Sequence, residues 1–341
     1  MRRSVPVRPR LADVAERAGV SKKTVSNVIN DFPFVAEATR AKVQLAIEEL
    51  GYQPNVSARN LARGRTGLVA LVIPRLDLPY FSELARHVVD VARNHSTAVV
   101  IEQVAGDKAA ERRIVNGELS RRIDGMVYSP WATTAADLRR RTDTTPMVLI
   151  GEAIYDGHYD HVSIDNVASG RTATEHLLQL GRRRIAVIGT QRRNSRGAAR
   201  ERYDGYRQAH IDAGLEFDPE LVRSAPRYDG EAGEAAMDSL LDVDPRPDAV
   251  FCFADLLALG AIRAIHRRGL RVPDDIAVVG HDDLAFGRVA SPALTTIAPD
   301  KRQIAERALD LLERRIVSRS APDPHGVEVG YTLQVRESSG G

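Results

Sequence analysis

Residues 11–30 read LADVAERAGVSKKTVSNVIN and predict two short helices joined by a tight turn. Apolar residues recur at spacings of three and four in the first half of this stretch: Leu11, Val14, Ala15 and Ala18. Gly19 ends the first helix, and Ser21 is a suitable N-cap for a second helix over residues 21–30. A small residue at 15, a glycine at 19 and an apolar residue at 25 fit a helix-turn-helix motif.

The residues around this motif predict a small three-helix domain. A third helix is expected over residues 37–50, with Val43, Ile47 and Leu50 facing inward. The second helix turns cations, amides and a hydroxyl outward: Lys22, Lys23, Ser26, Asn27 and Asn30. Such side chains suit phosphates and base edges, and an ordinary solvated face is the alternative. We therefore expect this domain to bind DNA.

The charge of the chain is segregated along its length. Residues 1–65 contain 12 Lys or Arg and 6 Asp or Glu, whereas the remaining 276 residues have a net charge of −4. A basic module joined to a slightly acidic body favours an anionic partner for the first and a different ligand for the second. A basic disordered tail is an alternative only for residues 1–10.

Length and composition limit the class of protein. With 341 residues, 43% of them hydrophobic, the chain is too long for one ordinary domain, and we expect two or three. A single cysteine excludes a disulfide framework and a cysteine-based zinc cluster. No run approaches the roughly 20 apolar residues of a membrane span, and no signal peptide is recognisable. We expect a cytoplasmic protein without a membrane partner.

Residues 66–341 alternate β-rich apolar runs with helical segments. The expected strands are residues 68–73, 98–102, 125–129, 147–150, 185–188, 249–253 and 276–280. The expected helices are residues 81–94, 109–121, 167–180, 199–213, 233–241, 256–268 and 304–315. This order predicts α/β architecture with doubly wound parallel sheets covered by helices on both faces. Periodicity alone leaves one large sheet and two lobes as alternatives.

The loops after the strands contain the candidate ligand-binding residues, because parallel sheets bind ligands beyond the carboxyl ends of their strands. They offer aromatics, carboxylates and a guanidinium: Tyr80, Phe81, Trp131, Asp165 with its neighbour Asn166, Arg202, Tyr228, Asp255 and Asp282. This set suits a neutral, hydroxyl-rich ligand. Each residue also has a structural alternative. Asp255 is equally suited to cap a helix, Asp165 to fix a loop, and the aromatics to pack in a core.

Enzyme motifs are absent from the sequence. It has no glycine-rich dinucleotide or phosphate loop, no His-Glu-x-x-His and no Gly-x-Ser-x-Gly, so we expect neither a cofactor nor catalysis. Cys252 lies in an apolar run and is expected to be an inert core thiol. Asp282 and Asp283 could bind a cation, but a structural and ligand-contacting pair is favoured, and no metal site is expected. Besides an enzyme, a solute-binding protein is a second alternative to a DNA-binding protein.

The quoted stretch resembles the lactose/galactose repressor (LacI-type) family of bacterial regulators. The resemblance also covers EELGYQPN at 48–55 and ARNLAR at 58–63, and it continues through the chain. It implies DNA contacts from the second helix, with the two lysines as principal base readers: Ser21, Lys22, Lys23, Thr24, Ser26 and Asn30. Two residues depart from the family pattern. Asn27 stands where Arg is usual, and Ala36 stands where a helix-capping residue is usual.

The same resemblance implies three parts of the chain. These are a helix-turn-helix domain over residues 1–54, a hinge helix or linker over 55–65, and a two-lobed core over 66–341 that is similar to periplasmic binding proteins. The first lobe is expected over about 66–180 and 299–327, and the second over 181–298 and 328–341.

The expected hinge is about two turns long, and an isolated helix of that length is marginal in water. In the resembled family it folds on the operator and inserts a leucine into the minor groove, and Leu61 occupies that position. Asn55 and Arg59 are further expected DNA contacts. Without the resemblance, a packing contact in a linker is the simpler interpretation of Leu61.

In the core, the resemblance implies effector contacts from Arg202, Tyr228 and Asp282. Ala254 stands where the family often has Asn, and His281 where it often has an aromatic residue. The departures predict an altered effector chemistry and a satisfied core role for His281.

The expected protein is a nucleoid-associated transcriptional regulator, a homodimer on a near-palindromic double-stranded DNA operator. A repressor of carbohydrate uptake or utilisation genes, released by a mono- or oligosaccharide, is favoured. A purine- or other metabolite-responsive regulator whose ligand promotes DNA binding is the alternative.

Overall fold

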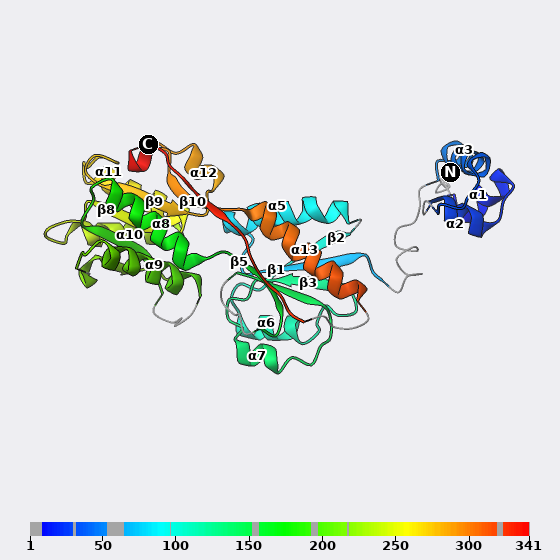
Figure 1. Cartoon of the computed structure of the whole chain (residues 1–341), viewed down its shortest axis with the longest axis horizontal. Coiled ribbons are helices and arrows are strands. Elements are labelled where there is room, and N and C mark those ends of the chain that lie inside the picture. Colours follow the sequence, from blue (N-terminus) through cyan, green and yellow to red (C-terminus); the bar gives the residue numbers. More distant parts are fainter. Residues whose placement is uncertain are drawn as a thin grey trace, which may run out of the picture. The chain divides into compact units, whose positions relative to one another are not determined.

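The computed structural model describes residues 9–29, 32–52, 65–95, 97–151, 157–191, 197–216, 218–318 and 323–340. The expected DNA contacts Asn30, Asn55, Arg59 and Leu61 lie outside these ranges and stay predictions. The chain divides into two compact units, residues 1–67 and residues 68–341 (Figure 1). Within the described ranges, no helix is long and apolar enough to cross a membrane.

In the described part of the first unit there are three helices: α1 (Leu11–Ala18), α2 (Lys22–Ile29) and α3 (Glu37–Leu50). Their shared core contains Val14, Ala15, Val25, Val28, Val43, Ala46 and Tyr52. Gly19 adopts the left-handed conformation, with φ 66°, that ends α1. The Oγ of Ser21 accepts the N–H of Thr24 at 3.1 Å and so caps α2. The predicted helix-turn-helix is confirmed. The N-cap residue of α3 is Ala36, which provides no side-chain hydrogen bond.

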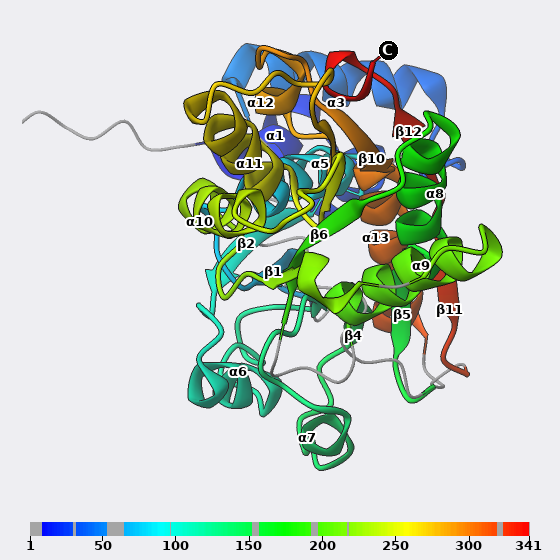
Figure 2. The ribbon, with the colours of Figure 1, turned by 90° about the vertical axis from the view of Figure 1, so that its left-hand side faces the viewer.

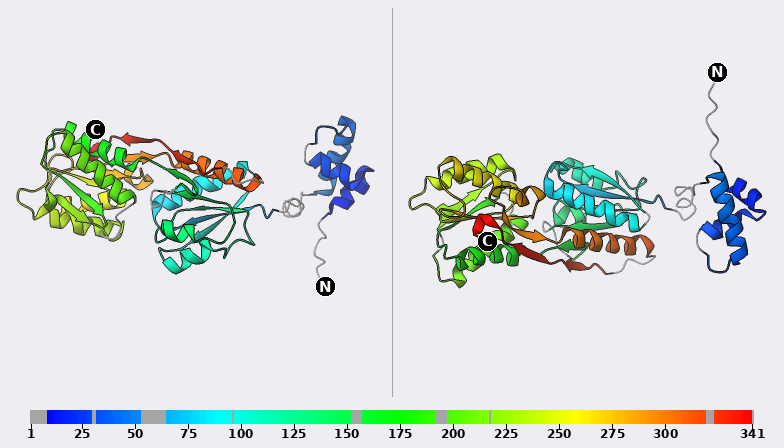
Figure 3. Two further views of the ribbon diagram at one scale, coloured as in Figure 1. Left: turned by 60° about the horizontal axis from the view of Figure 1, so that its bottom comes forward. Right: turned by 90° about the horizontal axis from the view of Figure 1, so that it is seen from above.

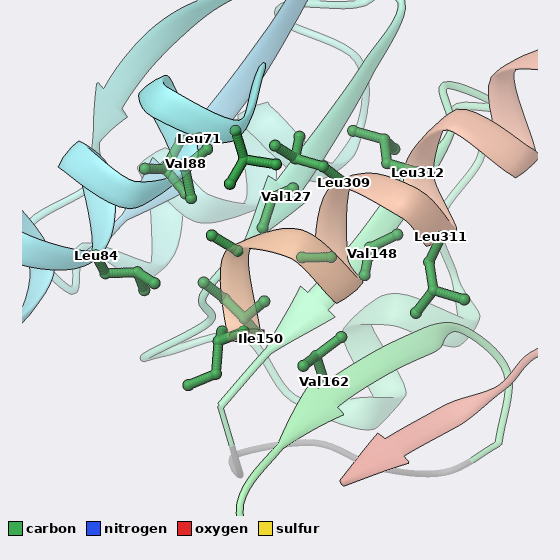
Figure 4. Close-up of a cluster of buried hydrophobic side chains, with 14 of the residues drawn as sticks. Leu71, Leu84, Val88, Val127, Val148, Ile150, Val162, Leu309, Leu311 and Leu312 are labelled. Atoms are coloured by element: carbon green, nitrogen blue, oxygen red, sulfur yellow. The ribbon is translucent and has the colours of Figure 1, made fainter. Parts of the chain in front are cut away.

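The first sheet of the second unit has the strand order β11-β5-β4-β3-β1-β2, and all its pairs are parallel. Its strands are β1 (Leu68–Ile73), β2 (Ala98–Gln103), β3 (Gly125–Tyr128), β4 (Met147–Ile150), β5 (Asp160–Ser163) and β11 (Gly326–Glu328). Helices α5 (Pro79–Asn94) and α13 (Lys301–Val317) lie side by side on one face (Figure 3). Leucines of both helices pack there on strand valines such as Val127 and Val148 (Figure 4). Helices α6 (Lys108–Val115) and α7 (Ala135–Arg139) cover the other face.

The second sheet has the strand order β12-β10-β9-β8-β6-β7. Its strands are β6 (Ile185–Thr190), β7 (Val222–Ser224), β8 (Ala249–Cys252), β9 (Ala277–His281), β10 (Thr295–Pro299) and β12 (Tyr331–Gln334). Only the edge strand β12 is antiparallel to its neighbour. Helices α8 (Asn166–Gln179) and α9 (Ala198–Asp212) cover one face, and α10 (Gly230–Leu241) and α11 (Asp255–Arg267) cover the other (Figure 2). A short helix α12 (Ala285–Arg288) follows β9.

The chain crosses from one sheet to the other three times. The passages lie between Ser163 and Asn166, between Pro299 and Lys301, and between Glu328 and Tyr331. The expected first passage near Gly181 is wrong by one helix, because α8 packs on the second sheet through Ala173 and Leu177. Periodicity indicates which side of a helix is apolar, but it does not indicate which sheet that side covers.

The close packing of α8 on α9 depends on two glycines. A Cβ at Gly170 would lie 2.3 Å from the carbonyl oxygen of Arg202, and a Cβ at Gly205 would lie 2.0 Å from that of Val167. Real Cβ atoms do not approach other atoms so closely, so only glycine lets these two backbones touch. This contact brings Arg202 on α9 against Asn166 at the start of α8.

Candidate DNA-binding face and effector cavity

The exposed face of α2 carries the expected DNA contacts. Lys22 and Lys23 are exposed, and neither has an ion-pair partner among the described residues. Ser21 and Thr24 are joined through their hydroxyls at 2.8 Å, while Ser26 and Asn27 are half-buried on the same helix. Two ammonium groups without a counter-charge at the start of a short helix suit phosphates or guanine edges.

A cavity of about 220 Å³ lies in the second unit, between the carboxyl ends of the two sheets. Six of the eight predicted effector residues line it: Tyr80, Phe81, Trp131, Arg202, Tyr228 and Asp282. The first three belong to the first lobe, with Tyr80 and Phe81 in the first turn of α5 and Trp131 in the loop after β3. The cavity therefore has an aromatic side and a side with opposite charges.

Arg202 is held rigidly at the cavity wall. Its Nε donates to the Oδ1 of Asn166 at 2.7 Å, and its Nη1 donates to the carbonyl oxygen of Phe253 at 2.5 Å. Within the described part of the chain, its Nη2 has no hydrogen-bond partner. Beside it, the hydroxyl of Tyr228 donates to the carbonyl oxygen of Gly189 at 2.6 Å, and burial raises the pKa of that phenol. The guanidinium thus presents one free edge to a ligand.

Asp282 and Asp283 have different environments. Asp282 lines the cavity with a strained backbone, φ 118°. Among the described residues, only one of its carboxylate oxygens has a neighbour within hydrogen-bond distance, the Nδ1 of His281 at 3.1 Å. Asp283 is paired with Arg288 and Arg336, both at 2.6 Å. Asp282 can therefore accept hydrogen bonds from a ligand, whereas the carboxylate of Asp283 is neutralised by two arginines.

Asp165 and Asp255 do not line the cavity. The side chain of Asp165 caps α8 by accepting the N–H of Ala168 at 2.8 Å. Asp255 is fully buried, and its carboxylate accepts the N–H of Leu284 at 2.7 Å and the hydroxyl of Thr296 at 2.6 Å. It is not the helix cap either, because that position belongs to Ala254, which does line the cavity. Burial, followed by the nearby charge of Asp282, raises the pKa of Asp255.

Three groups at the cavity were not singled out from the sequence. Ser129, Ser163 and Gln191 add polar side chains to its lining. A further pair, Glu83 on α5 and Lys301 on α13, belongs to the first lobe, and both residues also contact backbone atoms of the second lobe. The Nζ of Lys301 lies 2.6 Å from the Oε2 of Glu83 and 3.3 Å from the carbonyl oxygen of Asp283. Two single charges on helices that lie far apart in the sequence give no recognisable pattern. This pair therefore could not be predicted before the fold was known.

His281 lies in the core, as expected, but it is only half satisfied. It is fully buried, and its Nε2 has no hydrogen-bond partner within the described ranges. Burial, followed by the charge of Arg202, lowers the pKa of His281 to about 4. The folded protein therefore resists protonation of this ring.

This shift predicts a loss of stability in acid. Between about pH 6.5 and pH 4 the unfolded chain binds a proton at His281 that the folded chain does not bind, which costs up to roughly 3 kcal/mol. Stability should fall as the pH drops through this window and should be unaffected by this residue above pH 7. Urea unfolding at pH 7.5, 6 and 5 should show a smaller loss for His281→Phe than for the unmodified chain. Equal losses in the two chains would contradict this role.

Known protein families match parts of both units of the chain. Residues 10–55 match the family described as bacterial regulatory proteins, lacI family, and residues 174–339 match the periplasmic binding protein-like domain. The chain is 32% identical to the HTH-type transcriptional repressor PurR of Actinobacillus pleuropneumoniae, over 96% of this chain and 97% of that protein.

Two solved structures extend the comparison. A complex of the transcriptional regulator CelR with cellobiose is 33% identical, with a TM-score of 0.72 over 97% of this chain and all of that one. The Lac repressor dimer bound to operator and the anti-inducer ONPF is 27% identical, with a TM-score of 0.80 over 98% and 99% of the two chains. The chain belongs to the LacI family of DNA-binding transcriptional regulators. Its relatives are repressors and not enzymes.

Proposed function

We propose that this chain represses genes for carbohydrate uptake or utilisation, and that a mono- or oligosaccharide in the cavity releases it from DNA. The observation that carries the proposal is the two-sided cavity. Among the described residues, Arg202 and Asp282 each keep a hydrogen-bonding edge without a partner, which suits vicinal hydroxyls, while aromatic faces suit the apolar faces of a sugar ring. The likeness to a regulator in complex with cellobiose supports this choice.

We also propose a homodimer on a near-palindromic operator. Two copies of α2 would enter successive major grooves, with Leu61 as a minor-groove wedge between them. The likeness to the operator-bound Lac repressor dimer supports this arrangement. Binding of effector and operator would then be coupled reciprocally, so that each weakens the other by the same factor.

A ligand screen tests the proposal. Thermal unfolding would be followed with monosaccharides, oligosaccharides including cellobiose, and purines. A ligand at about 100 times its Kd should stabilise the folded state by roughly 2.7 kcal/mol. A sugar that stabilises the protein and releases the operator is the expected result. A purine that tightens DNA binding would instead favour the alternative.

Arg202→Ala should abolish the response to effector and leave operator affinity unchanged. Loss of a charged hydrogen bond costs about 1.5–3 kcal/mol, so effector affinity should fall about ten- to a hundredfold. The matched control is Arg200→Ala on the same helix, because Arg200 forms an exposed pair with Asp204 and lies over the ring of Tyr203, and it does not line the cavity. Calorimetric titration with the effector found in the screen gives the affinities. A response that persists in Arg202→Ala would remove this residue from the site.

The substitution of Lys22 and Lys23 by alanine should weaken operator binding. Removing one base-reading side chain costs about 1–3 kcal/mol of binding free energy. Removing one phosphate-binding side chain reduces the slope of log K against log salt concentration by about one. Binding would be measured on a duplex enriched from a random library with the unmodified chain. Arg17→Ala is the control, because Arg17 is already paired with Glu49 at 2.6 Å. Unchanged affinity in the lysine variant would contradict the assignment of α2 as the reading helix.

A further inference from the structure

A buried carboxylate lies beneath the loop that carries Trp131. Glu111 on α6 is fully buried, and it accepts hydrogen bonds from three successive backbone N–H groups. Its Oε1 lies 3.2 Å from the nitrogen of Trp131, and its Oε2 lies 2.6 Å from that of Thr133. The N–H of Ala132, 3.0 Å away, is shared by both oxygens.

All the described hydrogen-bond donors to the Glu111 carboxylate are neutral groups. A fourth donor is the buried hydroxyl of Tyr128, at 2.8 Å from Oε2. Among the described residues, no lysine or arginine forms an ion pair with Glu111. A buried carboxylate costs several kcal/mol unless hydrogen bonds replace its hydration. The loop must therefore keep three N–H groups pointing at one carboxylate, which fixes its backbone.

The fixed loop ends in the aromatic side of the cavity. Trp131 lines the cavity and is 39% exposed. Its ring also lies against the turn after β2, since a Cβ at Gly106 would be 3.6 Å from the ring atom Cε3. The backbone of Trp131 is thus held by Glu111, and its ring is supported by a second turn of the same lobe.

We propose that Glu111 is a positioning residue of the effector site, which holds Trp131 as a fixed aromatic wall and so selects ligands with an apolar ring face. The positioning role stands on the contacts of Glu111 alone. The selection of ligands rests on the function proposed above.

Trp131 is the only tryptophan of the chain, so its fluorescence reports on this loop alone. Glu111→Gln keeps the shape of the side chain but replaces one acceptor by an NH₂ group that faces N–H donors. We expect emission at longer wavelength and stronger quenching by acrylamide, with the far-ultraviolet circular dichroism of a folded protein. Unchanged emission and quenching in the folded variant would overturn the proposal.

Two further variants separate positioning from general loosening. Val115→Ala removes buried apolar contacts from the same helix and should lower the Tm without changing the emission. An equal change in emission would overturn the proposal, because the effect would then be unspecific. Tyr128→Phe removes one donor to the carboxylate and should shift the emission in the same direction by less. If Glu111→Gln does not fold, the emission of Tyr128→Phe decides whether the carboxylate positions Trp131.

Binding of cellobiose supplies the ligand arm. Aromatic contacts contribute about 0.5–1.5 kcal/mol, so Glu111→Gln should weaken binding about two- to tenfold. Unaltered affinity would overturn the selective role of Trp131. If the unmodified chain binds purines in place of sugars, the proposed function fails, whereas the fluorescence result still decides the positioning role.

Discussion

Replacing Glu83 by glutamine should lower the free energy of unfolding of the second unit by about 3 kcal/mol, the lower end of the range for breaking a buried ion pair. The side chain of Lys301 is only 7% exposed and that of Glu83 is 24% exposed, so the variant leaves a largely buried ammonium group without its counter-charge. The Oε1 of Glu83 also accepts the N–H of Ala285 from the second lobe at 3.0 Å. Urea unfolding followed by Trp131 fluorescence measures the loss.

A double variant tests whether the loss comes from an unpaired charge. Glu83→Gln combined with Lys301→Met replaces the pair by neutral groups and should recover most of the stability. Glu306→Gln is the matched control, because it breaks an exposed pair with Arg302 on the same helix α13 and should change little. The single variant Lys301→Met completes the comparison. If the loss of stability in the double variant equals the sum of the losses in Glu83→Gln and Lys301→Met, the ion pair is not the cause.

The second large effect is expected from Gly205→Ala. Alanine in an exposed helix is more favourable than glycine by about 1 kcal/mol, so helix propensity alone predicts stabilisation. Here the new Cβ would lie 2.0 Å from the carbonyl oxygen of Val167 and 2.7 Å from the nitrogen of Arg171, both of them backbone atoms that cannot turn aside. The helices α8 and α9 would have to separate. We expect destabilisation by about 3 kcal/mol, at the upper end for overpacking.

The control for this substitution is Gly330→Ala. A Cβ at Gly330 meets nothing within 4 Å, and this residue does not require a left-handed backbone. Alanine there should be neutral or slightly stabilising, because it restricts the unfolded chain. Thermal unfolding of both variants distinguishes the clash from a general effect of removing glycine. A stable Gly205→Ala chain would mean that the two helices slide apart at little cost.

The sequence predicted the elements whose signals are local. The three helices of the first unit follow from apolar spacing, from Gly19 and from the Ser21 cap, all within a few residues of one another. Strands that are buried on both faces, such as β1 and β4, gave continuous apolar runs and were predicted with their observed bounds. The strands β5, β7, β10, β11 and β12 were missed because they are short or contain polar residues, a glycine or a proline.

The candidate site was predictable in part. Strand ends indicated the cavity, so Tyr80, Arg202 and Asp282 could be selected from their place in the chain. Which strand-end carboxylates point into the cavity could not be predicted, because the orientation of Asp255 depends on partners about 30 and 40 residues later. The same limit applies to Glu111, whose partners lie about 20 residues away on another element.

The discontinuous first lobe has a consequence for synthesis on the ribosome. Its strand β5 ends at Ser163, but the face that bears Val148 and Val162 is covered by α13, which ends only at Val317. At about 5–20 residues per second, that apolar face waits roughly 8–30 s for its cover. The described core of the first unit, in contrast, lies between residues 11 and 52 and can form as soon as this stretch emerges. The nascent chain therefore completes its helix-turn-helix long before the second unit is complete.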